Sequence, residues 1–321
     1  MTRLPPDAPS ASDTQTAQIE RASSQPVQTS AAAGGVDRAL AAIPGAERLA
    51  IGLARVPLRS PTLPPATTTN HYLVGASAAV LVDPATPHRQ SQSRLRDVAV
   101  AWIAEVAPLQ AIFLTHHHND HIAAATPMAR DLGLPILAHQ ATAQLLAGRV
   151  TIDRIVTDGE PVAWDSDGPW TAMHTPGHAP GHLVLRGPDG GMIAGDMVAG
   201  HGTILIDPKD GDMGAYLESL ARMRTAAPPW LAPAHGPVLR QADETLQRYI
   251  AHRLAREARI YSALGDIAVA EDALLPVAYG DVARRFWPLA LRSMRAHLLY
   301  LQVQRRAQEL RPRRWRRLSD A

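Results

Sequence analysis

The pattern of apolar and polar positions divides the chain into a polar N-terminal segment, a mixed region and a C-terminal region of long helices. Residues 1–35 carry almost no large apolar side chain. Such a segment cannot offset its ordering entropy by burial, so we expect it to be disordered. Beyond it, short apolar runs of strand length alternate with helical periods, which predicts a sheet core flanked by helices.

The mixed region is expected to contain short elements. Apolar runs predict strands at 49–58, 71–74, 78–82, 111–114, 135–138 and 230–232, and helical spacing predicts helices over 88–106, 122–132, 140–147 and 213–226. Residues 150–195 predict a β-meander, in which Asp189-Gly190-Gly191 forms a hairpin turn. Long helices are expected over 242–264 and 288–309, with a short one over 271–279 between them. We therefore expect a core domain over 48–240, a helical domain over 241–310 and a basic tail over 311–321.

The densest chemistry lies in His116-His117-His118-Asn119-Asp120-His121, between the strand at 111–114 and a helix. An extended backbone points His116 and His118 the same way, and Asp120 and His121 fall in the opening turn of the helix. Neutral imidazole and carboxylate suit Zn²⁺, Fe²⁺ or Mn²⁺. The alternative is a solvated His-rich turn, which the two flanking regular elements disfavour.

One loop cannot saturate two metal ions, so further ligands are expected downstream. Three later strand-end loops carry His178, Asp196 and His235, each beside glycine or proline residues that fix a tight turn. Asp83, which precedes Pro84 at another strand end, is interpreted as a turn residue rather than a functional one.

These motifs carry a family resemblance. Thr115-His116-x-His118-x-Asp120-His121, Thr175-Pro176-Gly177-His178, Gly195-Asp196 and His235-Gly236, in this order, resemble the metallo-β-lactamase superfamily over about 48–240. The resemblance implies an α/β fold, an αββα sandwich with a dinuclear site at one edge. It assigns His116, His118 and His178 to one ion, Asp120, His121 and His235 to the other, and Asp196 between them.

The resemblance also implies an activity. Two divalent ions, Zn²⁺ in the first instance with Fe²⁺ or Mn²⁺ as alternatives, would hold a hydroxide that attacks an ester, thioester or phosphodiester, and Asp120 would orient it. His117 is expected to point away from the ligands. His182 is expected either to hydrogen-bond a ligand or substrate, or simply to pack. The chain has no cysteine, whereas true metallo-β-lactamases often use a cysteine ligand, so antibiotic hydrolysis is disfavoured.

Within the superfamily, the chain looks most like the β-lactamase-like protein 2 branch. Gly211-Asp212-Met213, His235-Gly236-Pro237, Tyr249-Ile250-x-His252-Arg253 and Ala296-His297-Leu298 carry this resemblance. It implies a C-terminal winged-helix-like domain, and animal members of the branch are single-strand endoribonucleases. The glycine expected after the last helix is missing from 304–309, so we expect the β-wing to be shortened or absent.

The charge distribution opens a second hypothesis. Net charge is +2 and the pI is about 9.2, but arginines are concentrated between Arg284 and Arg317, interleaved with Trp287 and Trp315. Such a strip can bind single-stranded RNA. The competing hypothesis is therefore a nucleic-acid-binding protein whose metal site is vestigial or structural, or a single-strand endoribonuclease acting through this basic C-terminal region. Solvated surface or oligomer contacts would explain the strip equally well. The intact ligand set favours a hydrolase of a small-molecule ester or thioester.

The sequence also bears on location. The N-terminus lacks the apolar stretch of a secretory signal, and no apolar run approaches membrane-spanning length. We expect a soluble cytoplasmic protein without a membrane partner.

Overall fold

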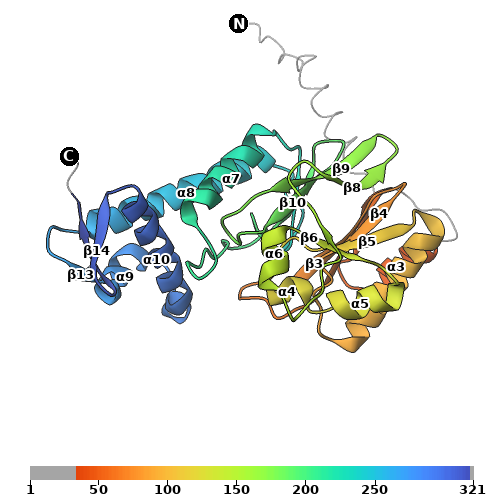
Figure 1. Ribbon diagram of the computed structural model, residues 1–321, viewed down its shortest axis with the longest axis horizontal. Coiled ribbons are helices and arrows are strands. Elements are labelled where there is room, and N and C mark those ends of the chain that lie inside the picture. The colour runs from red at the N-terminus through yellow and green to blue at the C-terminus, as the bar shows by residue number, and fades with distance from the viewer. Residues whose placement is uncertain (1–33, 319–321) are drawn as a thin grey trace, which may run out of the picture. The chain divides into compact units, whose positions relative to one another are not determined.

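The computed structural model describes residues 34–318 and contains two stacked β-sheets (Figure 1). The expectation of disorder over 1–35 falls almost wholly outside the described residues. The first sheet has the order β1 (Glu47–Ala50), β2 (Leu53–Arg59), β3 (Thr68–Val74), β4 (Ala79–Val82), β5 (Leu109–Phe113), β6 (Ile136–Ala138) and β7 (Arg154–Ile155). The second has the order β12 (Leu231–Pro233), β11 (Met192–Gly195), β10 (Leu183–Arg186), β9 (Gly168–His174) and β8 (Pro161–Asp165).

Alternation along the strands divides their side chains between two cores. In β3, Tyr72 and Val74 face the core between the sheets, while Leu73 packs with the helices on the outer face. Because successive side chains of a strand point to opposite faces, a strand with helices on one side and a sheet on the other is buried on both faces. All but the first residue of β3 are accordingly buried.

Helices cover the outer face of each sheet. On the first sheet lie α2 (Gly35–Ala41), α3 (Arg89–Glu105) and α5 (Ala125–Leu132), and on the second α7 (Met213–Thr225) and α8 (Ala242–Ala263). The short helices α4 (Asn119–Ile122) and α6 (Gln140–Leu145) complete this region. The expected α/β fold with a sheet sandwich between helices is confirmed.

Two pairs of parallel strands bring distant loops together. Strand β4 is parallel to β5, and β11 is parallel to β12. Parallel neighbours end at the same edge of a sheet, so the residues that follow these four strands are gathered there. The sequence segments after them contain Asp83, His116, Asp196 and His235.

Residues 150–195 largely follow the predicted meander. Strands β8 to β11 are consecutive and antiparallel, and β10 pairs with β11 across the turn at Asp189-Gly190-Gly191. Strand β7 differs, because it pairs in parallel with β6 of the first sheet. The predicted helix over 122–132 also differs, since it is split into α4 and α5.

The C-terminal region combines helices with a third sheet. After α8 come β13 (Val269–Ala270), α9 (Glu271–Tyr279), the 3-10 helix η1 (Arg284–Phe286), α10 (Trp287–Val303), β14 (Ala307–Arg311) and β15 (Arg314–Arg317). The sheet has the order β13-β15-β14. We call residues 242–317 the C-terminal module. Its limits as a domain, like the 48–240 core domain, stay predictions.

The end of this module corrects two expectations. Helix α10 stops at Val303 rather than continuing to Glu309, because Arg305 adopts the left-handed conformation, with φ 60°, that a glycine would favour. A hairpin of β14 and β15, with strands of five and four residues, follows where we expected the β-wing to be shortened or absent. Residues 314–317 form β15 rather than part of a tail, and the Trp315 side chain is fully buried, donating to Glu271 Oε1 at 3.0 Å.

None of the helices in the described part of the chain is long and apolar enough to cross a membrane.

His71 joins neighbouring segments of the first sheet by hydrogen bonds, and its protonation makes the stability of the fold depend on pH. Its Nε2 accepts from Ala85 N at 2.9 Å, so Nδ1 carries the proton and donates to Val56 O at 2.9 Å. Burial lowers the pKa of His71 to about 4. As pH falls below 6.5, His71 becomes protonated in the unfolded chain but stays neutral in the folded chain. The free energy of unfolding should therefore fall by about 2 kcal/mol between pH 7 and pH 5 because of this residue, and should stop falling near pH 4.

A histidine Cε1–H NMR titration of the folded protein measures this pKa directly, with exposed His201 as the internal reference. A midpoint for His71 at or above that of His201 would contradict the prediction.

Candidate metal centre

The seven histidines and aspartates predicted as ligands lie together at the shared edge of the two sheets. Among the described residues, groups whose ligand atoms lie within 4.8 Å of one another include His116–His118–His178, His116–His121–Asp196 and Asp120–His121–His235. A further group, His117–His118–Asp210, contains two residues outside the predicted set. The structure thus brings all seven predicted residues into one region.

Asp83 lies beneath this cluster and contacts it, whereas the sequence predicted only a turn residue. Its backbone is left-handed, with φ 48°, and its carboxylate is buried. It accepts from Thr115 N at 2.7 Å, Thr115 Oγ1 at 2.6 Å and His121 Nδ1 at 2.8 Å. With its hydroxyl proton given to Asp83, Thr115 Oγ1 can accept from His116 Nδ1 at 3.0 Å. One carboxylate therefore orients two imidazoles.

Asp210 plays the same part for His118. Its Oδ2 lies 2.9 Å from His118 Nε2 and 2.9 Å from His117 Nε2. His117 was expected to point away from the ligands, but its ring lies beside that of His118, with 4.6 Å between the centroids, and shares the Asp210 carboxylate with it. Asp210 directly precedes the Gly211-Asp212-Met213 motif, but nothing in that motif indicated a contact with His118.

Backbone carbonyls orient the remaining two imidazoles. His178 Nδ1 lies 3.0 Å from Leu205 O, and His235 Nδ1 lies 2.9 Å from Thr68 O. A carbonyl oxygen can only accept, so each of these Nδ1 atoms carries the proton and each Nε2 presents a lone pair.

Each of the five imidazoles thus has one nitrogen facing an oxygen acceptor and its other nitrogen facing the cluster. His116 Nε2 and His178 Nε2 each lie 3.0 Å from His118 Nδ1, and 3.3 Å from one another. No proton is left on these nitrogens to make hydrogen bonds between them. Three lone pairs at this separation repel unless a cation lies between them, so the trio fits a metal ion.

The second group also contains buried polar atoms that lack a partner. His121 Nε2 and Asp196 Oδ1 are buried and have no hydrogen-bond partner within the described residues. Asp196 Oδ2 lies 3.4 Å from His178 Nε2, and Asp196 Oδ1 lies 3.4 Å from His235 Nε2. Asp120 Oδ2 lies 3.6 Å from His235 Nε2. Buried polar atoms without partners are costly, and a second cation would satisfy these.

His182 supports Asp196 from behind. Asp196 N donates to His182 Nε2 at 3.1 Å, and His182 Nδ1 lies 2.8 Å from Thr175 Oγ1. Gly195, with φ 51°, passes so close that a Cβ there would lie 2.5 Å from His182 Nε2. Of the two expected roles for His182, hydrogen bonding to a ligand residue is the one observed.

Electrostatics keep most of the cluster ready for a cation. Burial holds the pKa of His116 well below its usual range and lowers the pKa of His178 to about 4, so both are neutral at pH 7. Burial also opposes charge on His121, but Asp196 and Asp83 outweigh it and raise the pKa of His121. Against the cost of its own burial, His235 and His121 hold the pKa of Asp196 well below its usual range.

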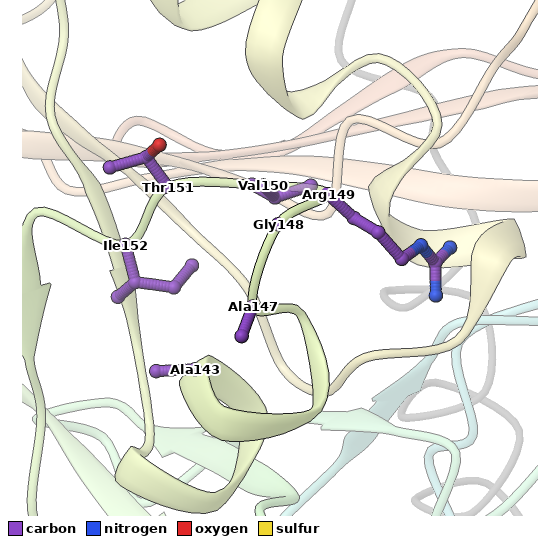
Figure 2. Close-up of a pocket in the computed structure, with 7 residues that line it drawn as sticks. All are labelled: Ala143, Ala147, Gly148, Arg149, Val150, Thr151 and Ile152. Atoms are coloured by element: carbon purple, nitrogen blue, oxygen red, sulfur yellow. The ribbon is translucent and has the colours of Figure 1, made fainter.

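A separate pocket lies beside α6 and the loop after it (Figure 2). Its lining contains none of the seven predicted residues, and comprises Ala143, Ala147, Gly148, Arg149, Val150, Thr151 and Ile152. The Arg149 side chain extends away from the other lining side chains in Figure 2, and its guanidinium donates to Asn119 Oδ1. The exposed lining of this pocket is more polar than apolar, and it carries none of the predicted ligand groups.

Asp83→Asn tests the role of the buried carboxylate. The amide has one acceptor for three donors, so the variant should lose about 2–4 kcal/mol of unfolding free energy. Its affinity for Zn²⁺ should fall about tenfold or more. Urea unfolding of metal-free protein and a chelator competition with Zn²⁺ measure the two effects.

The matched control is Asp153→Asn, because Asp153 also accepts a strand amide, from Ile136 N at 2.8 Å, but contacts no histidine. Equal effects of the two substitutions on Zn²⁺ affinity would refute the role given to Asp83.

The comparisons with known proteins agree with this geometry. Residues 64–235 match the family model described as "Metallo-beta-lactamase superfamily". The chain is 28% identical over 279 residues to the beta-lactamase-like protein 2 homolog of Drosophila melanogaster, covering 82% of this chain and 92% of that protein. It is 30% identical over 244 residues to the lactamase-like protein vrtG of Penicillium aethiopicum, covering 73% and 72%.

Its fold is similar to the crystal structure of a beta-lactamase domain protein from Burkholderia ambifaria, with a TM-score of 0.72 at 19% identity over 85% of this chain and 93% of that one. A match to more than half of the chain shows the family, and the resemblance expected from the sequence is confirmed. The chain belongs to the metallo-beta-lactamase superfamily, a family of metal-dependent hydrolases.

Proposed function

We propose that this protein is a dinuclear metal-dependent hydrolase acting on an ester, thioester or phosphodiester. The observation that carries the proposal is the convergence of unprotonated nitrogens in the His116–His118–His178 group, each oriented by an oxygen acceptor on its far side. Such an arrangement costs energy in an apo protein and is favourable only around a cation.

The ligands divide into two groups in this proposal. His116, His118 and His178 hold one ion, and Asp120, His121 and His235 hold the other. Asp196 lies between the two groups, because Oδ2 is near both His178 and His121, at 3.4 and 3.6 Å, and Oδ1 is 3.4 Å from His235. Imidazole and carboxylate without sulfur suit Zn²⁺ first, with Fe²⁺ or Mn²⁺ as alternatives.

Two bound divalent ions would supply the Lewis acidity that activates a water molecule and polarises the scissile bond. The protein contributes orientation. The Asp120 side chain is 17% exposed, so its carboxylate can accept a hydrogen bond from the attacking water and fix its direction. The backbone of Asp120 is itself held, because its carbonyl accepts from Thr69 Oγ1 at 2.8 Å.

The substrate in the leading proposal is a small-molecule ester or thioester. Nothing in the ligand set selects the acyl or phosphoryl group, because the site is defined by its metal ligands rather than by substrate contacts. The absence of cysteine still disfavours antibiotic hydrolysis.

A second candidate, binding of single-stranded nucleic acid, concerns the C-terminal module. The element order α8-β13-α9-α10-β14-β15 supports a winged-helix-like domain. Arg311 and Arg314 lie directly opposite one another in its hairpin, both are exposed, and neither has an acidic partner among the described residues. Like charges in cross-strand pairs are unfavourable unless an anion neutralises them, and a phosphate would do so.

Other features of the module weaken this candidate. The Arg295, Arg306 and Arg313 side chains pair with acidic side chains of the module itself. Trp315, expected to interleave with the basic strip, is buried and cannot stack on a base.

Asp196→Asn tests the hydrolase proposal. The wild type, reconstituted with Zn²⁺, should hold close to two ions per chain by elemental analysis, because seven ligands suit two sites. Removing the charge between two cations should cost at least one ion, and hydrolysis should fall at least about 100-fold. Exposed Asp167→Asn provides the control and should change neither quantity. A wild-type protein that retained no metal after reconstitution would refute the proposal.

Salt titration of full-length protein tests the nucleic-acid candidate. Two phosphate contacts from Arg311 and Arg314 predict that affinity for single-stranded RNA falls about sevenfold between about 50 and about 200 mM salt. Substituting both by Gln should remove most of that dependence. Substituting Arg89 and Arg94, two exposed arginines outside the module, should not. A flat, weak filter-binding response in the wild type would eliminate this candidate.

A further inference from the structure

A loop without regular secondary structure runs between the metal ligands and the C-terminal module. This loop, residues 203–212, leads into α7, and we call it the strap. On its inner side it supplies two of the acceptors described above, Leu205 O for His178 and Asp210 for His118. Both imidazoles belong to the same three-histidine group, so the position of the strap sets the orientation of two of its three members.

The strap is also joined to the turn that carries His178. Asp212 N donates to Gly177 O at 2.8 Å. Gly177, with φ 128°, packs so tightly here that a Cβ on it would lie 2.2 Å from Tyr216 N, at the start of α7. The ligand turn and the far end of the strap therefore cannot shift independently.

On its outer side the strap is held by two arginines of the C-terminal module. Arg253 of α8 donates to Thr203 Oγ1 at 2.8 Å and also to Ile204 O. Arg292 of α10 donates to Asp207 Oδ2 through both Nε, at 2.7 Å, and a terminal nitrogen. Asp207 is two residues from Leu205 and three from Asp210.

These contacts matter because the strap has little structure of its own. It belongs to no strand or helix, and its internal backbone hydrogen bonds are those of one tight turn, in which Asp207 O accepts from Gly211 N and Asp210 N. Ordering such a segment costs conformational entropy, which its anchors must offset. Outer hydrogen bonds to metal-binding histidines are effective only when their acceptors are held in place.

We infer that Arg253 and Arg292 are positioning residues for the metal centre, through which the C-terminal module holds the strap and so orients His118 and His178. This rests on the proposed function, because it takes His118 and His178 as ligands of one ion. Arg253 is buried and its loss would disturb the packing of α8, so exposed Arg292 offers the cleaner test.

The experiment compares Arg292→Gln with Arg295→Gln in the full-length protein. Both residues lie on α10 with similar side-chain exposure, 46% and 39%, and both substitutions remove one positive charge. Arg295 makes its ion pairs inside the module, with Glu271 and Glu309, and none of them is with the strap. Any difference between the variants therefore reports on the strap.

Two measurements are made. In Zn²⁺-loaded protein, one of the two ions should be lost to a chelator about tenfold faster in Arg292→Gln than in the wild type or in Arg295→Gln. In metal-free protein, hydrogen exchange at the amides of Gly211 and Asp212 should accelerate in Arg292→Gln alone, because the turn at Asp207 and the bond to Gly177 loosen.

Asp207→Asn should reproduce both effects, and adding Arg292→Gln to it should change little more, because the two side chains form one interaction. Equal zinc release and equal exchange in Arg292→Gln and Arg295→Gln would overturn the inference while leaving the hydrolase proposal intact. A wild type that binds no zinc would overturn the hydrolase proposal instead, and the exchange of metal-free protein would still decide whether Arg292 holds the strap.

Discussion

The metal centre depends on hydrogen bonds that point away from it. Each imidazole of the cluster has one nitrogen facing an oxygen acceptor, and that contact decides where the proton resides and hence where the lone pair points. Asp83 is the most consequential acceptor, since it fixes His121 directly and His116 through Thr115. The parallel pairing of β4 with β5 is what places Asp83 beside Thr115. The fold therefore serves the site by aligning acceptors as much as by aligning ligands.

That these seven residues lie together could be predicted from the sequence, because four of them share one short motif and the others follow later strands. Their acceptors could not. Asp83 precedes a proline, which is the commonest setting of an ordinary turn residue, and its burial follows only from the neighbouring strand. Asp210 is a single carboxylate in an irregular loop, brought to His118 by a chain reversal that no local pattern encodes. The mixed sheet-and-helix class and most of the meander over 150–195 were accessible from alternation and turn residues, whereas these tertiary contacts were not.

The C-terminal module shows a different limit of sequence reasoning. The number of arginines in this module did not show how much positive charge is free to bind a ligand. Several arginines pair with acidic residues that are distant in sequence, as Arg306 does with Glu257. Trp315 looked like a surface aromatic and is instead the centre of a small core. At Arg305 the rule that a left-handed position needs glycine failed, since arginine occupies it with φ 60°. The cost of one strained residue is small enough for the surrounding packing to offset.

The core beneath the second sheet has a consequence for how such proteins can be recombined. Leu246 and Tyr249 of α8 and Ala296 of α10 share one apolar cluster with Met192 of β11 and Tyr216 of α7. The Tyr249 hydroxyl also contacts the backbone at Ala199, in the loop after β11. A chimera that joined this catalytic sandwich to a foreign C-terminal segment would have to recreate an apolar helix face and a cation opposite Asp207. The contact between the sandwich and the C-terminal module is therefore an integral part of the fold, and the module could not be exchanged as an independent domain.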